Sequence, residues 1–218
     1  SSVWGKYIDI RYDLTNSANL GLLKATLAHE FLHFVQSYYG ATIFTSGWLD
    51  DATAVWLEKG ATGNSTYVPD VFDPSRPLSG LHRTVQREAK LSWNPNKWYN
   101  YTDSWDRAQD HGYAMSAFIE YLSNRSDIPN NFIYQLYQKI AAGKHPVAAI
   151  KELVSASTSY DLDMLFSFFI TDYAQLNHPY FADNALVSSL YNNQNGRGTK
   201  HRINKNTEDP FAVFDDTL

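Results

Sequence analysis

The chain has 218 residues, a formal net charge of −5 and 44% hydrophobic residues, which allows a full hydrophobic core and excludes global disorder. It contains no cysteine, which excludes disulfides and thiolate metal sites. No apolar run approaches the roughly 18 residues of a membrane span, and the mild acidity without a dense Lys/Arg cluster argues against a nucleic-acid partner.

The first expected elements are a strand and two helices. Polar and apolar side chains alternate over residues 4–14, which predicts a strand. Residues 19–39 place apolar side chains on nearly every face of a helix, which is typical of a central helix, and Gly40 fits its end. Residues 48–59 predict a second helix.

The rest of the chain divides into an irregular stretch and a helical lobe. Residues 61–104 are rich in Gly, Pro, Asn and Ser, with one short helix expected at 80–91, and such a long excursion is usually functional in a compact domain. We therefore expect three units: an active-site core at 1–60, this excursion, and a C-terminal helical lobe at 105–218. The helices of that lobe are expected at 105–124, 130–142, 146–155, 161–176 and 182–192.

The residues with the most specific chemistry are His29, Glu30 and His33, which form an HExxH motif inside the long helix. Two imidazoles four residues apart lie on one face of a helix and can bind one zinc ion through their ring nitrogens. Glu30, beside the first ligand, can accept a proton from a water that the metal activates. The alternative is a pair of histidines satisfied in a core helix. The position of the motif in the middle of the longest helix favours the metal site.

The residues after the motif point to one class of HExxH protein. The metzincin continuation would need glycine and histidine where this chain has Gln36 and Tyr39, so that class is excluded. Residues 48–58, WLDDATAVWLE, resemble the glutamate helix of gluzincin metallopeptidases, the clan of thermolysin and aminopeptidase N, with the aminopeptidase pattern W-L-N-E-G-x-A-x-x-x-E. The resemblance covers about residues 5–60, and it implies a zincin-like catalytic domain.

The resemblance also implies that Asp51 is the third zinc ligand, although the clan has glutamate at this position. Aspartate is one methylene shorter, so its carboxylate reaches roughly 1.5 Å less. The second helix then sits closer to the zinc, or the metal binds more weakly, or the site is degraded. Glu58, two turns later on the same face, is the rival ligand. A purely structural alternative makes Asp51 a first-turn acid that stabilises its helix.

A hydrolase of this kind needs a donor to the developing oxyanion, which gluzincins take from a downstream histidine or tyrosine. The candidates here are His111 and Tyr113, and Asp110 can orient His111. The alternative for each is an ordinary buried aromatic or a surface histidine.

Together these features predict an α+β fold that is mostly helical, a zincin-like catalytic domain followed by a helical lobe. Few residues precede His29, and one strand cannot form a sheet, so most of the N-terminal sheet would be missing from this chain. We expect upstream strands to have been removed from before Ser1, to be disordered, or to belong to a separate chain.

The predicted function is zinc-dependent hydrolysis of a peptide or protein substrate. An endopeptidase is favoured, because the Gly-x-Met-x-Asn segment of aminopeptidases is absent. The absence of cysteine, the many Tyr, Asn and Thr residues and the missing initiator methionine suit a secreted, extracellular bacterial protein.

Two functions of other classes compete with the peptidase. A catalytically decayed zincin-fold binding protein would keep the site, with Asp51 as the mark of its decay. A carbohydrate- or cell-surface-binding module would use exposed aromatic side chains between residues 93 and 105, and its histidines would be incidental.

Overall fold

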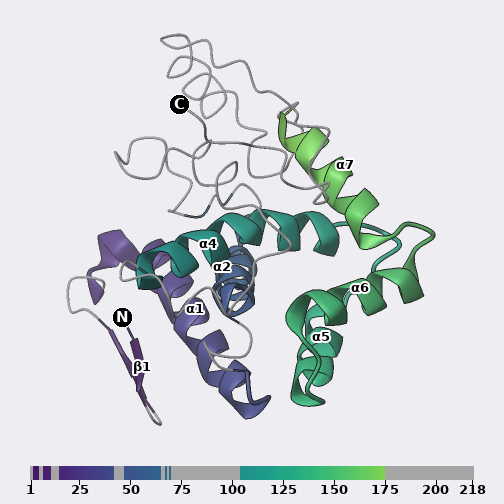
Figure 1. Ribbon diagram of the computed structural model, residues 1–218. Helices are drawn as coiled ribbons and strands as arrows, with labels where there is room; N and C mark the ends of the chain where they lie inside the picture. The colour runs from purple at the N-terminus through teal and green to yellow at the C-terminus, as the bar shows by residue number, and fades with distance from the viewer. Residues whose placement is uncertain are drawn as a thin grey trace.

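The computed structural model describes residues 2–4, 7–10, 15–41, 47–64, 67, 69 and 104–174. These residues form helices, apart from one short hairpin near the N-terminus (Figure 1). The elements in chain order are β1 (Ser2–Trp4), β2 (Tyr7–Asp9), the short 3-10 helix η2 (Ser17–Asn19), α1 (Leu20–Tyr38), α2 (Trp48–Thr62), α4 (Ser104–Ser123), α5 (Phe132–Ala141), α6 (Pro146–Ser157) and α7 (Leu162–Ala174).

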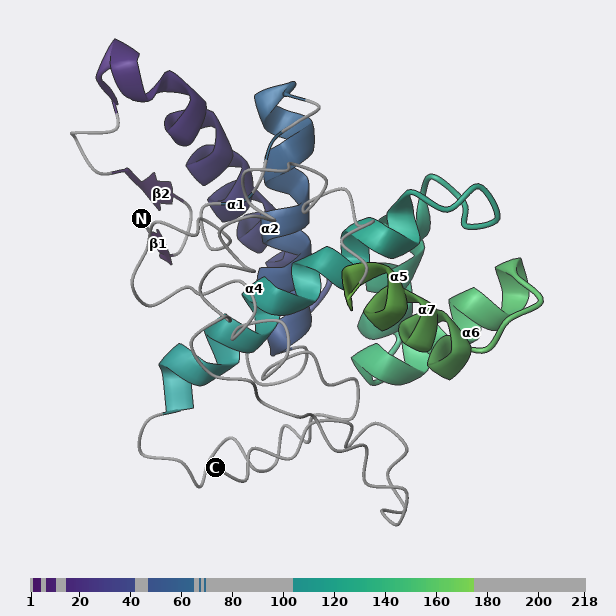
Figure 2. The ribbon, with the colours of Figure 1, turned by 90° about the horizontal axis from the view of Figure 1, so that it is seen from above.

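The helix at the centre of the described fold is α2, which contacts α1 on one side and α4 on another (Figures 1 and 2). Its first half is buried, and Leu49, Ala52 and Ala54 are fully buried. The distance between packed helices depends on the side chains at the contact, so the alanines of α2 allow its neighbours to approach closely. Gly63 ends α2 in the left-handed conformation (φ 66°), which glycine adopts without steric cost.

The prediction that the first helix is the central one is wrong. In α1 only Ala25, Glu30 and Gln36 are buried, and among the described residues α1 packs mainly against α2, with smaller contacts to the hairpin and to η2. An apolar composition on every face therefore does not mean that every face is covered. Four large apolar side chains share one exposed stripe: Leu20, Leu27, Phe31 and Tyr38, with 51, 39, 54 and 80% of their surface exposed.

The main hydrophobic core lies where α4 meets the last three helices. Phe118 of α4 is fully buried, and its ring centroid is 5.1 Å from that of Phe166 and 5.3 Å from that of Phe169, both on α7. Leu136 of α5 and Ile150 of α6 are fully buried in the same cluster. Burial of each such side chain contributes about 1.5–3 kcal/mol. This core therefore fixes one part of α4, and another part of the same helix packs on α2.

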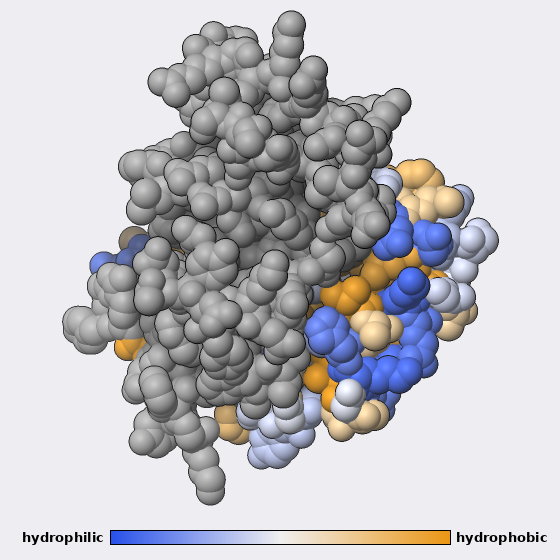
Figure 3. Space-filling model, in the orientation of Figure 1, coloured by the Kyte–Doolittle hydropathy of each residue, from blue (hydrophilic) through white to orange (hydrophobic). Residues whose placement is uncertain are grey.

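The surface over the last three helices is mixed in character. Figure 3 shows apolar residues framed by hydrophilic ones at this end of the molecule. Of the described helices, none is both long enough and apolar enough to cross a bilayer.

Most of the predicted helices are confirmed. The helices expected at 19–39, 48–59, 105–124, 130–142, 146–155 and 161–176 correspond to α1, α2, α4, α5, α6 and α7, with ends that differ by a few residues. The second helix runs past Gly60 to Thr62. The helices expected at 80–91 and 182–192 lie outside the described residues, as does most of the excursion at 61–104.

The predicted α+β zincin-like fold is wrong. The described residues are helical, and their only sheet is the two-stranded hairpin, in which Trp4 pairs with Tyr7 and Ser2 with Asp9. The strand expected at 4–14 is confirmed only in part: β2 lies within it, but Trp4 belongs to the antiparallel β1, and residues 11–14 lie outside the described residues. Alternation of polar and apolar residues has the same period in two short strands as in one long strand. The pattern alone could not distinguish them.

Candidate metal centre

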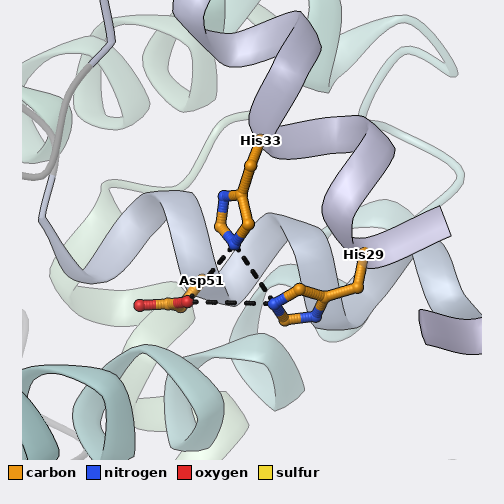
Figure 4. A group of neighbouring side chains, drawn as sticks. All are labelled: His29, His33 and Asp51. Carbon is orange, nitrogen blue, oxygen red and sulfur yellow. Dashed lines mark hydrogen bonds and ion pairs between the residues drawn. The ribbon is translucent and has the colours of Figure 1, made fainter. Parts of the chain in front are cut away.

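The two motif histidines point from α1 toward the first turn of α2 (Figure 4). His29 and His33 are four residues apart and therefore lie on one side of α1. Asp51 approaches them from α2, and the possible ligand atoms of the three residues all lie within 4.8 Å of one another. The structure thus brings together the three residues that the sequence predicts as metal ligands.

The distances between these atoms suit a zinc ion. The Nε2 atoms of His29 and His33 are 3.2 Å apart. Oδ1 of Asp51 lies 3.9 Å from Nε2 of His29 and 3.6 Å from Nε2 of His33. In the plane of the three atoms, the point equidistant from them is about 2.1 Å from each, which is close to the usual bond lengths from zinc to histidine nitrogen and carboxylate oxygen. A tetrahedral zinc would lie slightly out of this plane, so the ligands would draw in a little around it, and the shorter aspartate reaches far enough to take part.

Glu58, the rival third ligand, lies behind His29. Its Oε1 is 2.8 Å from Nδ1 of His29, so the carboxylate accepts the Nδ1–H hydrogen bond, and Tyr67 donates to its other oxygen. A carboxylate in this place fixes the orientation of the ring and directs the Nε2 lone pair toward the metal position. Asp51 and Glu58 thus have separate roles in this geometry.

His33 is oriented by Gln36, whose amide is fixed by the core. Gln36 is buried, and its Nε2 lies 2.9 Å from the backbone oxygen of Asp50 and from the hydroxyls of Thr53 and Tyr137, which share its two hydrogens. A backbone carbonyl only accepts, so the amide nitrogen must lie on that side. The amide oxygen then faces Nδ1 of His33 at 2.7 Å. Nδ1 therefore carries the proton, and Nε2 presents its lone pair.

As a result, three hydrogen-bond acceptors face one another: the Nε2 atoms of His29 and His33 and the Asp51 carboxylate. A cation between them removes the repulsion of their lone pairs. Burial by itself lowers the pKa of His33, but the hydrogen bond and negative charge of Asp51, together with Gln36, outweigh it, so this pKa is raised. Metal binding at these atoms would therefore compete with protons.

Glu30, which follows His29 in the sequence, is buried, with 8% of its surface exposed. It has no hydrogen-bond or ion-pair partner among the described residues. Buried charges are normally paired, because their desolvation is costly, and Glu120, the other buried glutamate, is paired with Lys59.

Of the two predicted oxyanion donors, Tyr113 lies at the site. It is on α4, and its ring centroid is 6.0 Å from that of His29. His111 is on the same helix, but its side chain lies outside the described part of the chain. The aromatic side chains of residues 93–105, on which a carbohydrate-binding role would depend, also lie outside it.

Sequence reasoning missed the roles of Gln36 and Tyr137. Gln36 follows His33 by three residues in an otherwise apolar stretch, and that spacing is the signal that could have indicated a hydrogen bond to the imidazole. Tyr137 comes about a hundred residues later, and no local pattern connects it to the motif.

Replacement of Gln36 with methionine is expected to weaken zinc binding by about 10–100-fold, because His33 loses its orienting partner. It also leaves buried polar groups unpaired, which lowers the free energy of unfolding by about 1–3 kcal/mol. Calorimetric zinc titration and thermal unfolding measure the two effects. Gln138→Met, an exposed change on α5, is the control and should affect neither, whereas unchanged zinc affinity in Gln36→Met contradicts the orienting role.

Comparison of the chain with protein-family models, with curated proteins and with solved structures finds no match. The functional argument therefore depends on the geometry of the site alone.

Proposed function

We propose that the protein is a zinc-dependent hydrolase of peptide bonds. The proposal is carried by one observation, the convergence of the two Nε2 atoms and the Asp51 carboxylate on a point at a zinc bond length from each. A zinc ion bound by His29, His33 and Asp51 would polarise the scissile carbonyl and make water more acidic.

Glu30 supplies the proton transfers in this proposal. It takes a proton from the attacking water as the new carbon–oxygen bond forms. It then gives that proton to the leaving amine as the carbon–nitrogen bond breaks, so the carboxylate is regenerated. Burial suits this role, because a carboxylate shielded from bulk water keeps its proton within the site.

Tyr113 is the proposed donor to the oxygen that gains negative charge on the substrate. The contact of its ring with that of His29 supports this assignment, since it brings α4 to the edge of the site. His111 is kept as the second candidate for the same role.

The experiment that tests the proposal combines metal analysis with an assay of cleavage. Elemental analysis of the purified protein should find stoichiometric zinc, and a diverse peptide library should be cleaved in a way that chelation abolishes and added zinc restores. Absence of bound metal after zinc is supplied would overturn the metal site. Stoichiometric zinc without cleavage of any peptide would favour a binding protein that retains the metal.

A further inference from the structure

Gly112 of α4 lies very close to the first turn of α2, which carries Asp51. A side-chain carbon at this position would lie 2.6 Å from Cβ of Asp51 and 2.7 Å from the backbone oxygen of Trp48. Both distances are well inside van der Waals contact. The backbone of α4 therefore rests directly on the first turn of α2, and only glycine permits this arrangement.

The atom that Gly112 contacts is the first carbon of a metal ligand. Asp51 has few rotatable bonds, so the position of its Cβ largely decides how far its carboxylate reaches. The turn that carries Asp51 cannot easily move aside, because Trp48, Leu49 and Ala52 are buried around it and α1 packs against the same helix. The contact at Gly112 thus holds the base of the ligand in place.

We propose that Gly112 is a positioning residue that sets the reach of Asp51. With α4 seated on the Asp51 Cβ, the aspartate carboxylate lies where a metal about 2.1 Å from each ligand atom can be bound. A glutamate, extended by roughly 1.5 Å, would overshoot this point. The close helix crossing therefore accounts for an aspartate in the position where the gluzincin pattern has glutamate. This inference rests on the proposed metal site.

The test compares Gly112→Ala with Gly60→Ala, in which the same methyl group is added to α2 at a place with no atom within 4 Å. Zinc affinity and the absorption spectrum of the cobalt-substituted protein are measured for both, with thermal unfolding of the metal-free forms. We expect Gly112→Ala to bind zinc at least about 10-fold more weakly and to alter the cobalt spectrum, which reports ligand geometry. Gly60→Ala should match the wild type in both.

A second variant keeps the inference testable if Gly112→Ala does not fold. Asp51→Glu leaves the helix crossing intact and only lengthens the ligand, and it should weaken zinc binding and change the cobalt spectrum. Wild-type affinity and spectrum in a folded Gly112→Ala protein, or wild-type affinity in Asp51→Glu, would overturn the inference. Failure of the wild type itself to bind zinc would instead refute the proposed function, so the two failures are distinguishable.

Discussion

Replacement of Glu30 with glutamine is expected to lower the rate of peptide hydrolysis by about two to four orders of magnitude and to leave zinc binding intact. An amide has the shape of the carboxylate but cannot accept the proton of the attacking water, and general base catalysis typically contributes an effect of this size. Because Glu30 is buried without a partner among the described residues, loss of its charge should not destabilise the fold. Steady-state kinetics, zinc titration and thermal unfolding measure the three quantities.

The buried Glu120 provides the matched control for this variant. Its carboxylate is paired with Lys59, so Glu120→Gln should lower the free energy of unfolding by about 1–3 kcal/mol while the hydrolysis rate stays near that of the wild type. The two buried glutamates would thus show opposite patterns. Wild-type kinetics in Glu30→Gln would exclude Glu30 as the base.

Replacement of Asp51 with alanine is expected to reduce zinc affinity by more than about 100-fold, the upper range for loss of an outer hydrogen-bonding partner, because a direct ligand is removed. The change should also be visible without metal. The charge of Asp51 raises the pKa of His33 against the effect of burial, so its removal should lower that pKa toward or below the ordinary histidine value. Calorimetry and an NMR titration of the His33 ring follow the two effects.

Asp163, the acid in the first turn of α7, is the control for the structural interpretation of Asp51. If Asp51 only stabilised its helix as a first-turn acid, Asp51→Ala and Asp163→Ala would lower the free energy of unfolding by the same small amount, and neither would change zinc affinity. If zinc affinity falls in Asp51→Ala and not in Asp163→Ala, Asp51 acts as a metal ligand and not only as a helix stabiliser.

Local patterns in the sequence were sufficient to predict the helices and the two histidines of the cluster. Periodicity and end signals are properties of short segments, and the two histidines lie four residues apart on α1, whereas Asp51 of α2 was predicted from the resemblance to the gluzincin pattern, with Glu58 as its rival. The burial of these helices could not be predicted in the same way. Leu27 and Phe31 have the composition of core residues, but whether they are covered depends on the packing of distant segments.

The remaining parts of the site depend on contacts between segments far apart in the sequence. Nothing in the sequence around Gly112 indicates a special role. Its role is visible only in the fold, where α4 lies against Asp51. Tyr137 of α5 contacts Gln36 of α1, and Gln36 in turn faces His33 on the same helix. The residues of the candidate cluster could therefore be proposed from the sequence, whereas the residues that position them could be found only in the fold.

The anchoring of both imidazoles has a consequence for how the site responds to its metal. His29 is held by Glu58 and His33 by Gln36 through groups that belong to the protein alone. The ligands are therefore preorganised, and little conformational entropy is lost when an ion arrives. In zinc fingers the free energy of metal binding is the free energy of folding. Here the buried core that contains Phe118 also contains Trp48, Leu49 and Ala52 beside Asp51, so packing holds the helices that carry the candidate ligands, and we expect the protein to stay folded without a metal.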